Sequence, residues 1–256
     1  MDRRIGAQLY TVRDYMKTAK DFEETIRKVR AIGYEIVQVS GCPLEATEIK
    51  KILDAYGMQC VVTHRSFQEL KEHTEAIMEY NRTLGCDSCG IGIAPMEYLK
   101  TADGVERFIE EMNAVADVLF ENGFYFAYHN HNVEFVKFDG KTIMDRMLRG
   151  SDPEKVKFIT DTYWLQMGGQ DPAAFIRKHP ERALYVHFKD LRLDPETPFV
   201  PEFSEIGEGN LNFKEITAAC DEAGVRFALV EQDTSRRDPF ESLKISYDHL
   251  KTLGFH

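Results

Sequence analysis

The sequence has no long hydrophobic run and little positive charge, and each absence excludes a class of protein. No segment approaches the roughly 20 consecutive apolar residues that a membrane-spanning helix needs. Lysine and arginine number 32 against 43 aspartates and glutamates, which gives a formal net charge of −11. A protein that binds nucleic acid needs a basic surface for its phosphate contacts. We therefore expect neither a membrane nor a nucleic-acid partner.

Cysteines are few, and their number and spacing argue against a disulfide framework. The five cysteines are an odd number, scattered along the chain, which suits reduced thiols in a cytoplasm. Cys86 and Cys89 have the CxxC spacing, but a strand-like segment follows them, and no second pair completes a zinc site. We interpret them as two small buried thiols. No long apolar run follows Arg3 and Arg4, so we expect no signal peptide and a cytoplasmic protein.

No stretch rich in proline, glycine or serine divides the chain, so we expect one domain over residues 1–256. The longest irregular stretch is Arg192–Leu211, which contains three prolines and two glycines. Loops of this length without secondary structure are usually functional or disordered. We expect this one to be a loop on the active face of the molecule.

Short apolar runs alternate with longer amphipathic ones along the whole chain. The short runs predict eight strands, at Ile5–Leu9, Ile36–Val39, Cys60–Thr63, Ser88–Ile93, Tyr125–Tyr128, Lys157–Thr160, Leu184–Phe188 and Phe227–Val230. The amphipathic runs predict helices, at Phe22–Ile32, Glu45–Tyr56, Phe67–Leu84, Gly104–Glu121, Ile143–Leu148, Pro172–Lys178, Phe213–Glu222 and Phe240–Leu253. Eight such units in 256 residues fit a closed α/β barrel, the (β/α)8 or TIM barrel. An open doubly wound sheet is less consistent, because no Gly-rich phosphate loop follows the first strand.

The alternation of side chains along a strand places three ionisable groups on the inner wall of this barrel. In Leu184–Phe188 the even-numbered residues are apolar, so His187 and Lys189 point inward at the strand's end. The same alternation points Asp161 and Glu231 inward on the neighbouring strands. One imidazole and two carboxylates suit Mn²⁺, Mg²⁺, Co²⁺ or Zn²⁺. We predict one divalent metal ion held by Asp161, His187 and Glu231, although each residue taken alone is also compatible with a hydrogen-bonding role.

The end of the fifth predicted strand adds further candidates. If Tyr128 packs outward, His129 and His131 point inward, and His129 becomes the natural fourth ligand or an acid/base group. Glu134 follows the strand and is expected to reach over the site. Two hydrogen-bonded interior histidines are an equally good interpretation. Candidate substrate-binding residues at the strand ends, for which interior polar filling or core packing stays open, are Gln8, Tyr10, His64, His131 and Trp164.

Six segments, which stand in order at nearly every strand end, match a known superfamily. They are Gly6–Asp14, Tyr128–Phe135, Asp161–Trp164, Val186–Asp190, Gly207–Gly209 and Val230–Asp233. On these residues the whole chain resembles the xylose isomerase-like TIM barrel superfamily, in the branch called sugar phosphate isomerase/epimerase. The resemblance implies one divalent metal ion, with Asp161, His187 and Glu231 at three of the family's ligand positions. The fourth ligand in ketose epimerases is a glutamate, where this sequence has His129, and the paired histidines are also similar to those of inosose dehydratases.

On this basis we expect a metal-dependent isomerase or epimerase of a small sugar or sugar phosphate. The metal would bind a carbonyl oxygen and a neighbouring hydroxyl, and would stabilise the enediolate formed when a C–H proton leaves. Glu231 would be the base, and His129 or Glu134 the opposing acid. Lys189 would stabilise developing negative charge or hold a substrate oxygen.

Three other functions share the same barrel. A lyase, such as a keto-sugar or inosose dehydratase, would form the same intermediate and then expel a hydroxyl with His129 or His131 as the acid. A DNA-repair endonuclease is disfavoured by the charge of −11. A non-catalytic sugar-binding barrel would bind metal without turnover. The sequence leaves open a homo-oligomer and a phosphate on the substrate, for which Arg192, Arg236 and Arg237 are candidates or solvated surface charges.

Overall fold

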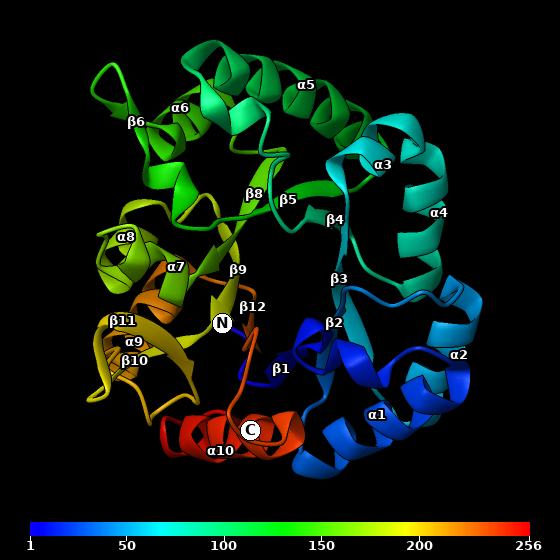
Figure 1. Cartoon of the computed structure of the whole chain (residues 1–256). Helices are drawn as coiled ribbons and strands as arrows, with labels where there is room; N and C mark the ends of the chain where they lie inside the picture. The colour runs from blue at the N-terminus through cyan, green and yellow to red at the C-terminus, as the bar shows by residue number, and fades with distance from the viewer.

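The computed structural model describes residues 1–256 and shows a closed barrel of parallel strands surrounded by helices (Figure 1). β1 pairs with both β2 and β12, which closes the barrel. The predicted (β/α)8 architecture is confirmed, and each predicted strand agrees with an observed one to within two residues at either end. The eight strands are β1 (Ile5–Gln8), β2 (Ile36–Val39), β3 (Gln59–Arg65), β4 (Ser88–Ile91), β5 (Tyr125–His129), β8 (Val156–Asp161), β9 (Ala183–Phe188) and β12 (Phe227–Val230).

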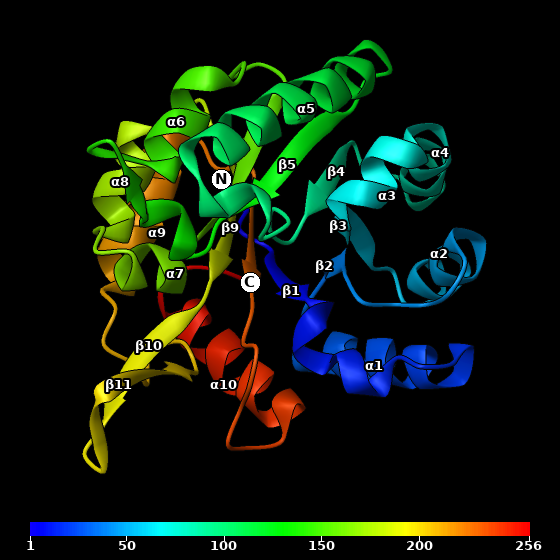
Figure 2. The same ribbon diagram turned by 45° about the horizontal axis from the view of Figure 1, so that its top comes forward.

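The helices lie outside the barrel in both ribbon views (Figures 1 and 2). None of them combines the length and apolar character that crossing a lipid bilayer requires. Short 3₁₀ helices at Leu9–Tyr15, Tyr98–Lys100 and Val133–Phe135 complete the helical segments. The α-helices are α1 (Ala19–Ile32), α2 (Ala46–Ala55), α3 (Phe67–Glu72), α4 (Thr74–Leu84), α5 (Ala102–Glu121), α6 (Ile143–Gly150), α7 (Thr162–Met167), α8 (Pro172–Lys178), α9 (Phe213–Ala223) and α10 (Pro239–Thr252).

One predicted helix and one predicted loop are wrong. The helix expected over Phe67–Leu84 is broken at His73 into α3 and α4. Next to the break, the Thr74 hydroxyl donates to the Leu70 carbonyl oxygen, a side-chain bond that bends helices. The loop expected over Arg192–Leu211 contains most of an antiparallel hairpin instead.

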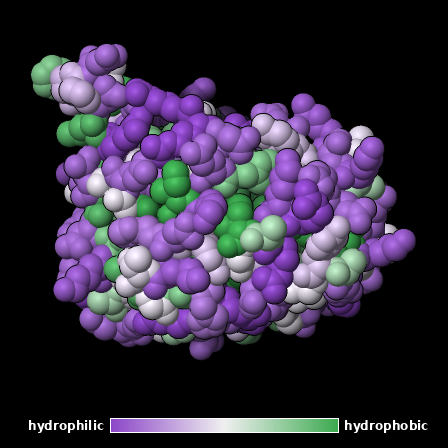
Figure 3. Space-filling view, turned by 90° about the horizontal axis from the view of Figure 1, so that it is seen from below, coloured by the Kyte–Doolittle hydropathy of each residue, from purple (hydrophilic) through white to green (hydrophobic).

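This hairpin consists of β10 (Asp190–Asp194) and β11 (Thr197–Ser204) and projects beyond the rest of the molecule (Figure 2). In a two-stranded sheet each strand has a free edge, so the prolines of β11 do not interrupt a central ladder. Phe199 near its tip is 95% exposed. Elsewhere the face seen from below is largely hydrophilic, with small apolar areas (Figure 3). A second, shorter hairpin joins β6 (Lys137–Phe138) and β7 (Lys141–Thr142).

Buried apolar side chains pack on both sides of the barrel wall. Outward-facing strand residues form two large apolar clusters with the helices. A smaller cluster, which includes Ala127, Ile159, Tyr185 and Leu229, fills the barrel interior. Each of these four residues stands two positions before a polar residue at a strand's carboxyl end. The apolar filling therefore supports a polar layer above it, at the open mouth of the barrel.

Candidate metal centre and active site

Four ionisable side chains meet in this polar layer. They are His129 at the end of β5, Asp161 at the end of β8, His187 on β9 and Glu231 directly after β12. All four are buried, and one ligand atom from each lies within 4.8 Å of the others. The strand register explains the meeting, because Asp161 pairs with His187, and Glu231 follows the partner of His187 by two residues.

His129 is oriented by a backbone carbonyl group. Its Nδ1 atom lies 3.0 Å from the carbonyl oxygen of Gly92, which can only accept, so Nδ1 carries the hydrogen. Its Nε2 atom then faces Oδ2 of Asp161 at 3.2 Å and Oε2 of Glu231 at 3.7 Å. Burial lowers the pKa of His129, but the hydrogen bond to Asp161 and the charge of Glu231 outweigh it and raise that pKa above its ordinary value.

His187 is oriented in the same way by a glutamine. Its Nε2 atom lies 2.7 Å from Oε1 of Gln38, whose amide nitrogen donates to Ser40. Nδ1 of His187 therefore faces Oε2 of Glu231, at 3.0 Å. Burial lowers the pKa of His187 below its ordinary value, which favours the neutral imidazole that a metal requires.

Asp161 uses its two oxygens for different contacts. Oδ1 accepts a hydrogen bond of 2.9 Å from the backbone of Trp164 and so caps the first turn of α7. Oδ2 faces His129 and Lys189. The backbone N–H of Asp161 donates to Oδ1 of Asn130, at 3.0 Å. These contacts fix the side chain before any ligand arrives.

The four residues fit a divalent metal ion. Two imidazole nitrogens and two carboxylates form a donor set that Mn²⁺, Co²⁺ and Zn²⁺ accept, and Mg²⁺ less readily because of the nitrogens. Both imidazoles are bonded to acceptors on their outer nitrogen, an arrangement that metal-binding histidines almost always show.

Lys189 places a positive charge inside this group. Its side chain is 1% exposed, and Nζ lies 2.8 Å from Glu231, 3.2 Å from Asp161 and 3.1 Å from Asp233. Burial alone would lower the pKa of Lys189, but the three carboxylates raise it above its ordinary value. The site therefore contains a charged ammonium group beside its two buried carboxylates.

A cavity of about 400 Å³ is lined by two of the four residues, His129 and Glu231, whereas Asp161, His187 and Lys189 lie outside its lining. Only two of the 13 lining residues are hydrophobic. Of the predicted substrate-binding residues, Gln8, Tyr10, His64 and His131 line it. Trp164 does not line it, and its ring lies 5.0 Å from that of His131, between centroids. Sequence reasoning left out several lining residues, namely Arg13, Ser40, Gly41, Gly92, Ile93, Asp233 and Thr234. The alternation along β12 does direct Asp233 inward with Glu231, although the sequence alone assigns it no role.

His64 and His131 flank His129 in the cavity wall, with ring centroids 5.6 Å and 4.8 Å from it. Burial lowers the pKa of His131 to about 3 and that of His64 well below its ordinary value, so both are neutral imidazoles. Nε2 of His64 and Nδ1 of His131 are buried without a hydrogen-bond partner in the protein. Both nitrogens are therefore unsatisfied within the protein alone.

Glu134 does not reach over the site as the sequence suggested. It is fully buried and outside the cavity lining. Its oxygens accept hydrogen bonds from the Tyr128 hydroxyl, at 2.6 Å, and from the His131 backbone N–H, at 2.7 Å. Tyr128 packs outward as expected, with its ring 5.9 Å from that of Phe158. Glu134 thus holds the segment after β5 in place from below.

Comparisons with known proteins agree with this architecture. A model of the family described as xylose isomerase-like TIM barrel matches residues 26–253. Inosose dehydratase of Geobacillus thermodenitrificans is 24% identical over 91% of this chain and 90% of its own length. Two solved structures of sugar phosphate isomerase/epimerases from Parabacteroides distasonis superpose with TM-scores of 0.81 and 0.78, at 21% and 25% identity. The first covers 97% of this chain and 93% of its own, and the second 96% and 97%.

Proposed function

The chain belongs to the xylose isomerase-like TIM barrel family, and we propose that it is a divalent-metal-dependent enzyme acting on a small carbohydrate. The reaction would begin with removal of a proton next to a carbonyl group. The observation that carries this proposal is the buried group of His129, Asp161, His187 and Glu231, with ligand atoms within 4.8 Å. A divalent ion held there supplies Lewis-acid polarisation of a substrate carbonyl.

Glu231 is the proposed base. Burial would raise its pKa, but Lys189 and His187 hold the pKa of Glu231 well below its ordinary value, so the carboxylate is ionised. It also lines the cavity, within reach of a bound substrate. Since a carboxylate with a low pKa is a weak base, proton removal relies on a polarised carbonyl that makes the neighbouring C–H bond more acidic.

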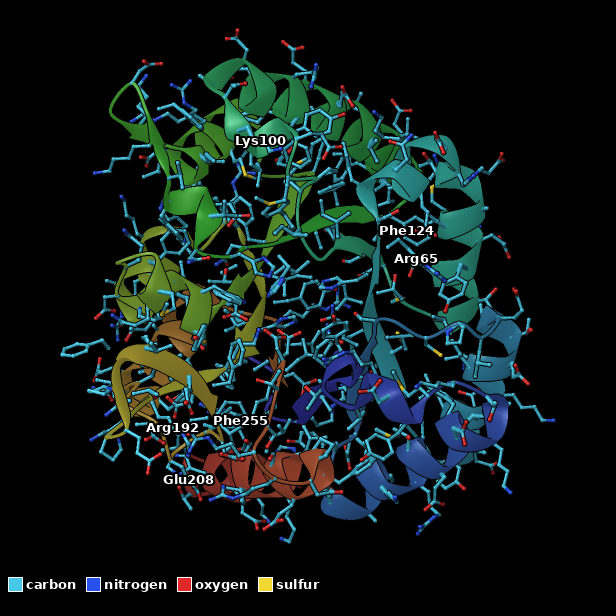
Figure 4. The ribbon with its side chains drawn as sticks, in the orientation of Figure 1. Arg65, Lys100, Phe124, Arg192, Glu208 and Phe255 are labelled. Atoms are coloured by element: carbon cyan, nitrogen blue, oxygen red, sulfur yellow. The ribbon has the colours of Figure 1, made fainter.

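The cavity suits a polyhydroxylated substrate. Its lining is mostly polar, and about 400 Å³ matches a small molecule. The three candidate phosphate-binding arginines are all paired with carboxylates: Arg192 and Arg236 with Glu202, at 3.3 and 2.7 Å, and Arg237 with Glu208, at 2.7 Å. Figure 4 shows Arg192 and Glu208 among the side chains between the β10–β11 hairpin and α10. These pairs neutralise all three arginines, whereas Arg13, which lines the cavity, donates only to backbone carbonyl oxygens.

The fate of the enediolate separates two candidate reactions. An isomerase or epimerase, which the sequence favoured, returns the proton to a carbon atom. An epimerase needs a second base on the opposite face of the substrate, and the only other carboxylate in the cavity lining, Asp233, is hydrogen-bonded to Lys189. Glu134 lies outside the cavity. This arrangement gives little support to a two-carboxylate epimerase.

A dehydratase-type lyase is therefore the second candidate, and the site favours it. Glu231 would take the C–H proton, a carbon–carbon double bond would form, and the β-hydroxyl would leave as water with the proton that Glu231 has taken. His131 and His64 lie in the cavity wall, where the N–H of a neutral imidazole can polarise the leaving hydroxyl through a hydrogen bond. The similarity to an inosose dehydratase over nearly the whole chain supports the same reaction class.

Incubation with Mn²⁺ and a panel of unphosphorylated ketoses, aldoses and cyclic keto-polyols in deuterated water tests the proposal. Loss of one water, followed by mass spectrometry, identifies the lyase. A product that gains one deuterium but loses no water identifies the isomerase or epimerase. Full turnover after removal of metal by a chelator would contradict the metal-dependent function, and the absence of exchange and elimination across the panel would contradict carbonyl-adjacent proton removal.

A further inference from the structure

The ammonium group of Lys189 contacts the same oxygen atoms that the two histidines face. Oε2 of Glu231 lies 2.8 Å from Nζ of Lys189 and 3.0 Å from Nδ1 of His187. Oδ2 of Asp161 lies 3.2 Å from Nζ and 3.2 Å from Nε2 of His129. A divalent ion bound by these four residues would thus use the oxygens that the lysine now neutralises.

Lys189 has a third carboxylate partner outside the four-residue group. Oδ2 of Asp233 lies 3.1 Å from Nζ, and the Asp233 side chain is 25% exposed in the cavity wall. The backbone of Asp233 is fixed, because both terminal nitrogens of Arg13 donate to its carbonyl oxygen at 3.1 Å. A lysine side chain is flexible and its ammonium can exchange partners by a small rotation.

Two aromatic rings make the surroundings of the ammonium group strongly attractive to a cation. Nζ lies 5.4 Å from the ring centroid of Trp164 and 5.3 Å from that of Phe203 on β11. These rings keep water away from one side of the lysine, which strengthens its interaction with the carboxylates. The lysine is therefore a substantial competitor for any other cation at the site.

We propose that Lys189 is the resident counter-ion of the metal centre, with Asp233 as its alternative partner. Without metal, the ammonium group neutralises Asp161 and Glu231. When a divalent ion binds, the ammonium group withdraws to Asp233, because repulsion between two neighbouring cations falls as they separate. This inference rests on the proposed metal-dependent function and adds two residues that set the affinity for the ion.

Calorimetric titration of Mn²⁺ into chelator-treated protein tests this competition without measuring turnover. Lys189→Met removes the competing charge and should bind Mn²⁺ about tenfold more tightly than the unaltered protein. Asp233→Asn removes the alternative partner, so the ammonium group stays on the metal ligands and the affinity should fall about tenfold. A general loss of structure would not raise the Mn²⁺ affinity of one variant and lower that of the other.

Lys157→Met is the matched control, because Lys157 lies near the opposite end of β8 and donates to the backbone carbonyl groups of Pro153 and Glu181. Its affinity for Mn²⁺ should be unchanged. Thermal denaturation gives a second measurement: the metal-free form of Lys189→Met should melt at a lower temperature than the unaltered protein, and Mn²⁺ should stabilise it by a larger increment.

The outcomes separate this inference from the proposed function. If the unaltered protein binds no Mn²⁺, the metal-dependent function and the counter-ion role are both wrong. If it binds Mn²⁺ but Lys189→Met binds it equally or more weakly, only the counter-ion role is overturned. If metal-free Lys189→Met does not fold, the Mn²⁺ affinity of Asp233→Asn tests the inference instead. An unchanged or higher affinity in that variant overturns it.

Discussion

The hydroxyl group of Tyr128 donates a hydrogen bond of 2.6 Å to Glu134, and this buried pair joins the segments after β4 and β5, which position His129 and His131. The same hydroxyl accepts from the backbone N–H of Ala94, two residues after the Gly92 carbonyl that orients His129. Glu134 also accepts from the backbone N–H of His131. The segments after β4 and β5 are therefore held against each other below the cavity.

Tyr128→Phe should destabilise the protein by about 1–3 kcal/mol, because the change removes a donor from a buried carboxylate and an acceptor from a backbone N–H. Urea unfolding measures the loss. Tyr34→Phe is the matched control, since that fully buried hydroxyl makes one hydrogen bond, to the Leu243 carbonyl oxygen. A loss in Tyr128→Phe no larger than in the control would show that the Glu134 bond has no special importance.

Asp161→Ala should abolish Mn²⁺ binding and turnover, because it removes one of the two carboxylates from the proposed metal centre. Metal content after dialysis and activity with excess Mn²⁺ measure the two effects. Asp171→Ala is the control, because Asp171 also caps the first turn of a helix, accepting from Ala174 at 2.7 Å. It should lose about 1 kcal/mol of stability and no metal. Retained metal and full activity in Asp161→Ala would contradict the proposed centre.

Asp190→Asn should destabilise the base of the β10–β11 hairpin. The Asp190 carboxylate accepts from four backbone N–H groups, those of Leu191, Gly207, Gly209 and Leu211, at 2.7 to 3.2 Å. The NH2 group of asparagine cannot accept a hydrogen bond, so the two backbone N–H groups that face it would lose their acceptor. We expect a loss of about 2–3 kcal/mol in thermal unfolding and faster proteolysis near residue 208.

Asp145→Asn provides the comparison for this change. Asp145 belongs to the capping box of α6, and the substitution there should change stability by about 0.5 kcal/mol or less, because the site is near the surface. Equal effects of the two substitutions would argue that the Asp190 bonds contribute nothing beyond an ordinary cap.

The native thiols should react very slowly with Ellman's reagent. All five cysteines are buried and free, and burial raises the pKa of Cys89 to about 12. Since the thiolate is the reactive form, we expect modification at least about a hundredfold slower than in guanidinium-unfolded protein. Rapid modification of one or two thiols in the native protein would instead indicate that the Cys86–Cys89 pair is accessible and available for redox chemistry.

The barrel and the meeting of Asp161, His187 and Glu231 could be predicted because strand geometry repeats every two residues. Once the apolar row of β9 is identified, the direction of His187 is fixed, and the parallel register brings the neighbouring strand ends together. His129 followed from the same reasoning, since Tyr128 does pack outward. The chemistry of these residues stays a prediction until metal binding is measured.

Features beyond the strand ends could not be predicted in this way. Glu134 lies in a 3₁₀ turn, where the alternation of a strand no longer applies, and the turn directs it into the protein. The β10–β11 hairpin is a local pairing, with only Pro195 and Glu196 between its strands, but the prolines at 195, 198 and 201 indicated a loop instead. Arg13 reaches the cavity from a 3₁₀ helix, so its contact with the Asp233 backbone has no periodic signal.

Asp161 serves two structures with one side chain, since one oxygen caps α7 and the other faces the proposed metal ion. Evolution at this position is consequently constrained twice: a replacement must preserve both the fold of a helix and the coordination of an ion. His129 has no such double duty, because outside the four-residue group its ring is hydrogen-bonded only to the Gly92 carbonyl. A barrel of this kind can more readily acquire a new reaction by exchanging the residue at position 129 than by exchanging Asp161.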